Sequence, residues 1–138
     1  MIEIRPFTIA DYDQALALWR SLEGVGLSAA DSRENIELFL QRNAGLNFVA
    51  GADGKVVGTV LCGCDGRRGY LYHLAVASAY RRKKLGCALV ERCVRTLQQA
   101  GIEKCHLFIF TDNEPALAFW KHNGWAERHD LEFMSRKL

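Results

Sequence analysis

The sequence predicts an α/β protein of the α+β class, in which strands and helices enclose one core. Several segments alternate apolar and polar residues as half-buried strands do, and others repeat apolar residues at helical spacing. The 138 residues fit one domain of ordinary size, and 49% of them are hydrophobic, which is enough for a full core. We therefore expect residues 1–138 to form a single domain.

Seven segments are expected to be strands. The segment 2–7 alternates apolar and polar residues, and 55–64 is long and rich in β-branched residues. Asp53 followed by Gly54 is a strong hairpin signal just before the second of these. The expected strands cover residues 2–7, 47–51, 55–64, 70–77, 104–110, 125–129 and 131–136.

Four segments are expected to be helices. The first carries Tyr12, Ala15 and Trp19 at helical spacing. In the fourth, Pro115 suits the first turn and Gly124 suits the position just past the end. The expected helices cover about 9–22, 30–43, 85–100 and 114–122.

Composition and charge exclude several classes of protein. A net charge of +2 is too small to argue for nucleic-acid binding. There is no run of 18 apolar residues, so no membrane span is expected, and the N-terminus lacks a signal-peptide core. The five cysteines are scattered and odd in number, so reduced thiols in a cytoplasmic protein are a simpler account than a disulfide framework. Cys62 and Cys64 lack partners at ligand spacing, so we expect strand packing and no metal.

The stretch from Gly69 to Ala88 organises the chain. It reads as a strand, then four basic residues at 81–84, then the start of an apolar helix with Gly86 in its first turn. A helix N-terminus has unpaired backbone N–H groups and a positive partial charge, so basic side chains beside it create a site suited to phosphate or pyrophosphate. The alternative is a solvated basic loop that happens to precede a helix.

Three motifs in order resemble the GCN5-related N-acetyltransferases, the GNAT family. Residues 80–89 resemble the family's pyrophosphate loop, Arg/Gln-x-x-Gly-x-Gly/Ala. Leu74-Ala75-Val76 matches the strand that pairs with the pantetheine arm, and residues 113–125 look like the second cofactor motif, Asn-x-x-Ala-x-x-x-Tyr-x-x-x-Gly-Phe. The segment 56–69 is similar to the bacterial YpeA-type branch.

The resemblance implies a mixed, mostly antiparallel, twisted sheet of about seven strands flanked by about four helices. A splayed parallel strand pair would hold acyl-CoA, with acetyl-CoA as co-substrate. It implies a cofactor site made of Leu74, Ala75, Val76, Arg81, Arg82, Lys83, Lys84, Leu85, Gly86, Cys87, Ala88, Asn113, Ala116, Phe119 and Trp120. Asn113 has a second possible role as the cap of the last helix.

The catalytic residues are harder to assign. By strand alternation residues 70, 72, 74 and 76 share one face, so Tyr72 and Tyr70 occupy the positions where several relatives place a general base, whereas His73 is expected to point away. A free tyrosine has a pKa of about 10 and is a poor base at pH 7, so these phenols would relay protons through water or orient the amine. Glu23, in the loop that lines the acceptor pocket of relatives, is a further candidate for binding the amine.

Two positions depart from the family pattern. Trp120 stands where relatives have a tyrosine acid, and an indole N–H donates a hydrogen bond but does not transfer its proton. Lys84 stands at the first glycine of the phosphate loop, where it adds a charge but must suit the local backbone.

The favoured function is transfer of the acetyl group of acetyl-CoA to a primary amine by direct attack in a ternary complex. The acceptor would be a small molecule or a peptide or protein amine, with no nucleic-acid or membrane partner and a possible homodimer. The alternative is a catalytically weak acyl-CoA-binding or sensor module, suggested by Trp120 and the lack of an obvious base.

Overall fold

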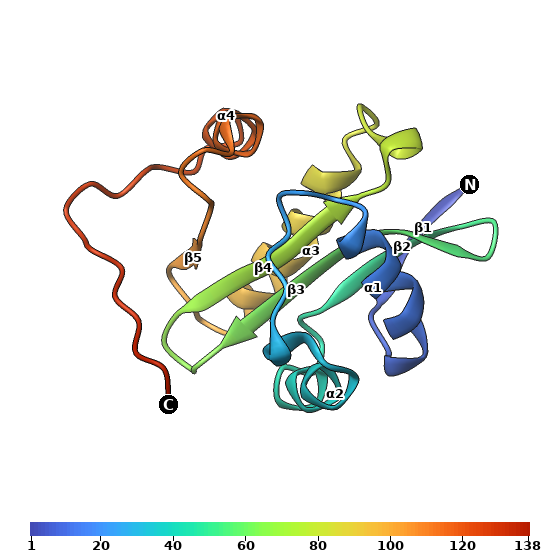
Figure 1. The fold of residues 1–138 in the computed structure, drawn as a ribbon, viewed down its shortest axis with the longest axis horizontal. Helices are drawn as coiled ribbons and strands as arrows, with labels where there is room; N and C mark the ends of the chain where they lie inside the picture. The colour runs from blue at the N-terminus through green and yellow to red at the C-terminus, as the bar shows by residue number, and fades with distance from the viewer. The chain divides into compact units, whose positions relative to one another are not determined.

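The computed structural model describes residues 1–138 and divides them into two units, residues 1–108 and 109–138. Unit 1 holds a five-stranded sheet in the order β1-β2-β3-β4-β5, with the first four strands antiparallel and β4 parallel to β5 (Figure 1). The strands are β1 (Ile2–Pro6), β2 (Phe48–Ala52), β3 (Lys55–Cys64), β4 (Gly69–Val76) and β5 (Cys105–Leu107). The α+β class and the mixed, mostly antiparallel sheet are confirmed.

Helices cover both faces of this sheet. The helices of unit 1 are α1 (Tyr12–Arg20), α2 (Arg33–Arg42) and α3 (Leu85–Gln99), with short 3-10 turns η1 (Ile9–Asp11), η2 (Ala29–Asp31) and η3 (Ser78–Tyr80). Leu97 of α3 lies so close to β4 that a side chain at Gly69 would collide with it, and Leu89 leaves only a tight space for one at Gly58 of β3. On the opposite face α1 and α2 bury Trp19 and Ile36 against the sheet. No helix is long and apolar enough to cross a bilayer.

Trp19 is the centre of the core on the α1 face, and none of its surface is exposed. Its indole N–H donates a 2.9 Å hydrogen bond to the Thr59 hydroxyl on β3. That hydroxyl donates in turn to the backbone carbonyl of His73 on β4, at 2.8 Å. Burial of an aromatic side chain contributes about 1.5–3 kcal/mol to the stability of the fold. Here the indole N–H and the Thr59 hydroxyl are also hydrogen-bonded. One side chain therefore joins α1, β3 and β4.

The sheet has five strands instead of about seven, so this expected number was wrong. Residues 125–129 and 131–136 form no strands, and the expected strand 104–110 is reduced to Cys105–Leu107. A strand needs a hydrogen-bonded neighbour and an apolar face to bury. The backbone N–H of Trp125 is instead bonded to the carbonyl of Trp120, and Phe133 and Met134 remain 72% and 88% exposed.

A β-bulge in β4 changes which residues share a face. Leu61 of β3 is opposite Tyr72, whereas Thr59 is opposite Ala75, so His73 and Leu74 together face Val60 alone. His73 adopts a left-handed backbone with φ of 51°.

This bulge corrects the expectation that 70, 72, 74 and 76 lie on one face. Tyr70 and Tyr72 do share the α1 and α2 face, because they are opposite Gly63 and Leu61. Val76, opposite Gly58, lies on the α3 face. The expectation that His73 points away from the tyrosines was also wrong, because its ring packs against Trp19 on the α1 face.

Unit 2 contains α4 (Glu114–His122), which begins and ends as its sequence predicts. The Asn113 side chain accepts a hydrogen bond from the N–H of Ala116 at 3.2 Å, so the capping role of Asn113 is confirmed. Trp120 is buried within this unit, edge-on to Phe119 at 5.2 Å and to Trp125 at 5.1 Å between ring centroids.

Asp11 should make the stability of unit 1 depend on pH. Its carboxylate accepts two hydrogen bonds from Arg5, at 2.7 and 2.9 Å, and one from the N–H of Thr8. Burial opposes its ionisation, but Arg5 and Thr8 outweigh burial and hold the pKa of Asp11 below its usual value. Stability from this lowered pKa is present above the unfolded value of about 4 and is lost as the pH falls through the folded value.

Asp11→Asn should therefore lower the free energy of unfolding by about 1–2 kcal/mol at pH 7. The loss should be smaller at pH 3, because below about pH 4 the unfolded wild-type chain takes up a proton at Asp11 before the folded protein does. Urea denaturation at both pH values measures this difference. The control is Asp13→Asn, whose side chain is 89% exposed in a 3.8 Å ion pair and should cost little. An equal loss at pH 3 and pH 7 for Asp11→Asn would contradict the assignment.

Candidate functional site

The edge of β4 beyond Leu71 has no strand beside it. β5 pairs with β4 only from Gly69 to Leu71, while β4 continues to Val76. The backbone groups along this part of β4 are therefore available to an extended ligand that lies alongside as an added strand does. The splayed parallel pair expected from the sequence is confirmed by this pairing.

Val76 shows which of these backbone groups face the edge. Its carbonyl accepts a 3.3 Å hydrogen bond from Nε of Arg81, while the next N–H, that of Ala77, is bonded to Val57 of β3. The N–H and C=O of one residue in a strand point to the same side, so the N–H of Val76 also faces the open edge. A ligand amide at this edge can thus meet both a donor and an acceptor.

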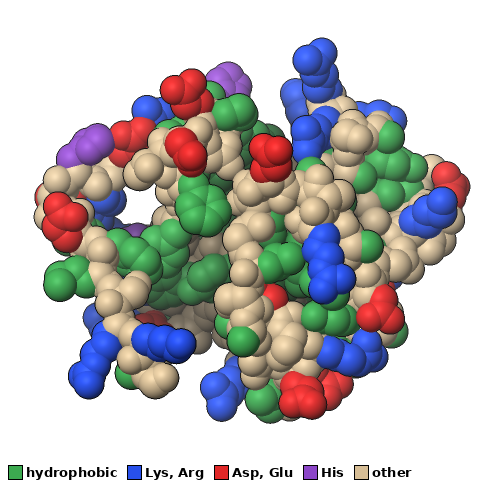
Figure 2. Space-filling model, viewed as in Figure 1, with side chains coloured by type: hydrophobic (Ala, Val, Ile, Leu, Met, Phe, Trp, Pro, Cys, Tyr) green, Lys and Arg blue, Asp and Glu red, His purple; other side chains and the backbone are tan.

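The loop between β4 and α3 carries the expected basic cluster. All four side chains from Arg81 to Lys84 are exposed. In Figure 2, Lys and Arg side chains project at the upper right, where this loop lies in Figure 1. No side chain caps the N-terminus of α3, so its first turn and the cluster can face an anion together. These residues fit the phosphates of a CoA molecule.

Lys84, which stands at the first glycine of the phosphate-loop pattern, adopts a backbone conformation that glycine favours. It is the N-cap of α3, with φ of 58° and ψ of 22°, in the left-handed region. Arg82 is also left-handed, with φ of 64°. L-residues other than Gly, Asn and Asp rarely adopt this conformation, and it costs them about 1–2 kcal/mol. Lys84 therefore places a positive charge at the helix N-terminus, although its backbone conformation is strained.

Aromatic rings line the α2 side of β4 near the point of divergence. The ring of Tyr70 is stacked on Phe108 at 6.3 Å, and that of Tyr72 is edge-on to Phe39 at 6.1 Å. Burial raises the pKa of the Tyr72 phenol, and Tyr70 and Cys62 raise it further. Tyr72 therefore stays protonated at neutral pH, which suits a hydrogen-bond donor and not a base.

His73 and Asp31 form a pair that sequence reasoning did not find. Nε2 of His73 lies 2.6 Å from Oδ1 of Asp31, and both side chains are largely buried, at 14% and 13% exposed. The bulge aims His73 at this carboxylate, which comes from η2 in the loop between α1 and α2. Nothing in the strand pattern signals a bulge, so alternation placed His73 on the wrong face. Glu23 lies exposed in the same loop.

The cysteines pack within the sheet and under α3. Cys62 and Cys93 are fully buried, which confirms the packing role expected for Cys62. A hydrogen bond with Cys62 and burial raise the pKa of Cys93, and burial raises the pKa of Cys105 to about 12, so both remain thiols at neutral pH. No group of three or more His, Cys, Asp or Glu side chains is placed to hold a metal ion.

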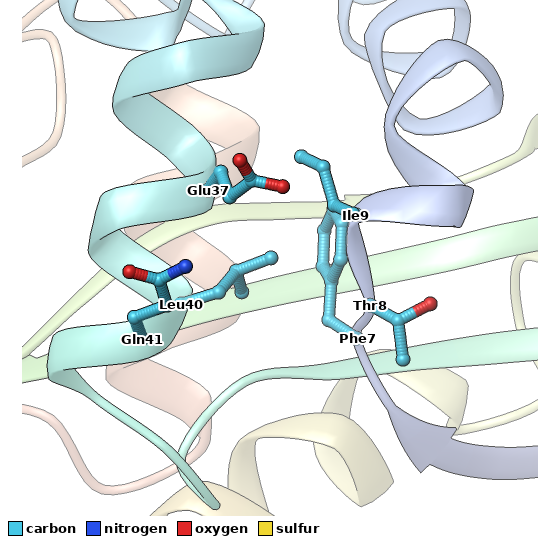
Figure 3. Close-up of a pocket in the computed structure, with 6 residues that line it drawn as sticks. All are labelled: Phe7, Thr8, Ile9, Glu37, Leu40 and Gln41. Carbon is cyan, nitrogen blue, oxygen red and sulfur yellow. The ribbon is translucent and has the colours of Figure 1, made fainter.

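A shallow hollow of about 210 Å³ lies between η1 and α2, away from β4 (Figure 3). Phe7 and Leu40 form its apolar floor, and Glu37 points toward Ile9 at its rim. None of the residues expected to bind the cofactor or catalyse the reaction lines it, so it is separate from the β4 site.

The comparisons with known proteins agree with this geometry. The model of the acetyltransferase (GNAT) family matches residues 13–125. Ard1 from Thermoplasma volcanium superposes with a TM-score of 0.79 at 21% identity, over 91% of this chain and 82% of that one. The PaiA N-acetyltransferase from Thermoplasma acidophilum, in complex with coenzyme A, gives 0.75 at 21% identity, over 90% and 89%. The apo aminoglycoside 6'-N-acetyltransferase AAC(6')-Ig from Acinetobacter haemolyticus gives 0.80 at 19% identity, over 99% of each chain.

The chain belongs to the GNAT family of acetyltransferases. It is an acetyl-CoA-dependent N-acetyltransferase, and acetyl-CoA is its co-substrate. The three solved structures show the same fold at low identity, so the acceptor has to be argued from this chain's own residues.

The strain at Lys84 can be measured by comparing two small residues there. Lys84→Gly should be more stable than Lys84→Ala by about 1 kcal/mol, because only glycine adopts the left-handed backbone without cost. At Lys83, whose φ is negative, the order should reverse by about 0.5–1 kcal/mol. Chemical denaturation of the four variants gives both differences, and alanine equal to glycine at residue 84 would contradict the left-handed assignment.

Proposed function

We propose that this protein transfers the acetyl group of acetyl-CoA to a primary amine, by direct attack in a ternary complex on the α1 and α2 face of β4. The observation that carries the proposal is the open edge of β4, which leads from an uncapped, basic helix N-terminus to a face with titratable side chains. Diphosphate, pantetheine arm and thioester would follow that edge in order.

The cofactor roles follow from this path. In the stretch Leu74-Ala75-Val76, the backbone groups of Leu74 and Val76 pair with the pantetheine amides. The stretch from Arg81 to Ala88 holds the diphosphate. We propose that Asn113, Ala116, Phe119 and Trp120 of unit 2 also bind the cofactor, as the resemblance of residues 113–125 to the second cofactor motif implies.

The acceptor we propose is a primary amine of a small molecule, a peptide or a protein. The loop that follows α1 presents the exposed carboxylate of Glu23, which suits an ammonium group as it approaches. One solved structure with this fold is an aminoglycoside 6'-N-acetyltransferase, which by its name acetylates an amino group. Tyr72 and Tyr70 would orient the amine, since Tyr72 keeps its proton at neutral pH.

We further propose the bacterial YpeA-type branch, on the strength of the segment 56–69, and a single catalytic domain over residues 1–138. Five free cysteines favour the reducing cytoplasm. A homodimer would cover apolar side chains near the C-terminus such as Phe133 and Met134, which are largely exposed.

A second candidate is a catalytically weak acyl-CoA-binding or sensor module. Trp120 favours it, because indole supplies no transferable proton where relatives have a tyrosine. A CoA thiol is acidic enough to leave as a thiolate with hydrogen bonding alone, so the enzyme remains the first proposal.

The two candidates are separated by product analysis. Wild-type protein should consume acetyl-CoA only in the presence of an amine, tested with polyamines, aminoglycosides and peptides with free N-termini or lysines, and mass spectrometry should find the N-acetylated amine. Initial rates should give intersecting double-reciprocal lines, and no acetylated protein should accumulate. CoA binding without transfer to any amine would favour the binding module.

Arg82 tests the phosphate site. Arg82→Ala should raise the Kd for CoA about tenfold, which is about 1.4 kcal/mol, because it removes one charged donor from the diphosphate. Gly86→Asp should weaken CoA binding further by placing a carboxylate in the first turn of α3. Calorimetric titration with CoA measures both. The control is Arg95→Ala, on the same helix and paired only with Glu91, and an equal effect there would argue against a specific site.

A further inference from the structure

His73 of unit 1 carries an imidazole that can accept and release a proton. It lies at the bulge of β4, immediately after Tyr72 and immediately before the residues proposed to pair with pantetheine. Its ring is edge-on to Trp19 with 4.7 Å between centroids, and its backbone carbonyl is bonded to Thr59. Both the ring and the backbone of His73 are therefore fixed by the core.

Asp31 holds the ring from the other side. Its Oδ1 lies 2.6 Å from Nε2 of His73, and its Oδ2 accepts a hydrogen bond from the N–H of Ser28 at 3.0 Å. The hydroxyl of Tyr12 on α1 donates to the backbone carbonyl of Asp31 at 2.6 Å. The carboxylate is thus anchored by its own turn and by α1 before it meets the imidazole.

The tautomer of His73 follows from this contact. An ionised carboxylate only accepts hydrogen bonds, so it selects the neutral imidazole that has its proton on Nε2. The lone pair is then on Nδ1, the nitrogen that can accept a proton. Every fully buried side-chain nitrogen and oxygen in the structure has a hydrogen-bond partner. A His73 Nδ1 without such a partner is therefore accessible to solvent.

We propose that His73 is the general base of acetyl transfer and that Asp31 is its positioning residue; this inference rests on the proposed function. The neutral amine attacks the thioester carbonyl as a C–N bond forms and the C–S bond breaks. One amine proton passes to Nδ1 of His73, directly or through one water, and the sulfur leaves with the C–S electron pair. The imidazolium then returns the proton to solvent, from which the CoA thiolate takes one.

The titratable and charged groups near the His73–Asp31 pair come from β4, α1 and α2. Tyr72 is the neighbour on β4, and its raised pKa keeps it protonated. Tyr12 comes from α1 and bonds Asp31 through the backbone. Arg33 of α2 lies over the Tyr12 ring at 5.8 Å and pairs with the exposed Asp13.

A purely structural pair, which ties the loop to β4, is the alternative to be excluded. His73→Gly is the informative variant, because glycine accepts the left-handed backbone at residue 73 and leaves a space for an added imidazole. General-base catalysis typically contributes 10²–10⁴-fold, so kcat should fall about 100-fold or more while the Kd for CoA stays within about twofold. The low-pH limb of kcat/KM that a general base produces should disappear.

Added imidazoles should restore part of the rate to His73→Gly, and more basic ones should restore more at a pH where they are neutral. Asp31→Asn should lower kcat, because the amide offers an N–H to Nε2 and favours the unproductive tautomer. Nitrogen-15 NMR of the His73 ring should then show the proton moved from Nε2 to Nδ1. Matched controls are His129→Asn and Asp13→Asn, both at exposed side chains, which should keep the wild-type rate and pH profile.

The outcomes separate this inference from the proposed function. A wild-type enzyme that acetylates amines, with His73→Gly equally fast, overturns the general base alone. A His73→Gly enzyme whose lost rate no added imidazole restores would also overturn the general base alone. So would an Asp31→Asn enzyme in which the His73 tautomer and the pH profile are those of the wild type. A wild-type protein that binds acetyl-CoA and acetylates no amine overturns the proposed function, and the base with it.

Discussion

The hydrogen-bonded chain from Trp19 through Thr59 to the carbonyl of His73 is the constraint on which the site depends. It buries the indole N–H and the hydroxyl with satisfied partners, and it holds His73 in a left-handed conformation that an isolated strand would avoid. The resulting bulge moves Val76 to the α3 face while Tyr70 and Tyr72 stay on the α1 face. A substitution of Thr59 would therefore disturb the backbone of His73, although Thr59 is not among the residues proposed to bind substrate.

The cofactor path depends on a second constraint, the length of β5. Because β5 stops pairing at Leu71, the backbone of β4 around Val76 is left for a ligand, and Arg81 donates a hydrogen bond to the carbonyl of Val76 at that edge. The strained backbone at Arg82 and Lys84 leads into α3, whose first turn has no side-chain cap and can face an anion. In our proposal, cofactor binding and proton transfer use neighbouring parts of one strand but different groups: the backbone for the first and side chains for the second.

Much of this could be predicted from the sequence. Apolar periodicity placed α1, α2, α3 and α4 within a few residues, and the motif order gave the family. The bulge could not be predicted, since no residue type marks it, and so His73 was assigned to the wrong face. The contact between Asp31 and His73 could not be predicted either, because it spans 42 residues of sequence. The extra C-terminal strands were expected from alternation alone, which does not report whether a sheet neighbour exists.

The most direct test of the account is a crystal structure of the protein with CoA bound. It should show the pantetheine amides paired with the backbone of Leu74 and Val76, the diphosphate at the N-terminus of α3, and the thiol near the bulge, on the side from which the His73 ring can reach an acceptor amine. A CoA molecule bound away from the edge of β4, or a thiol separated from His73 by the full thickness of the sheet, would contradict it.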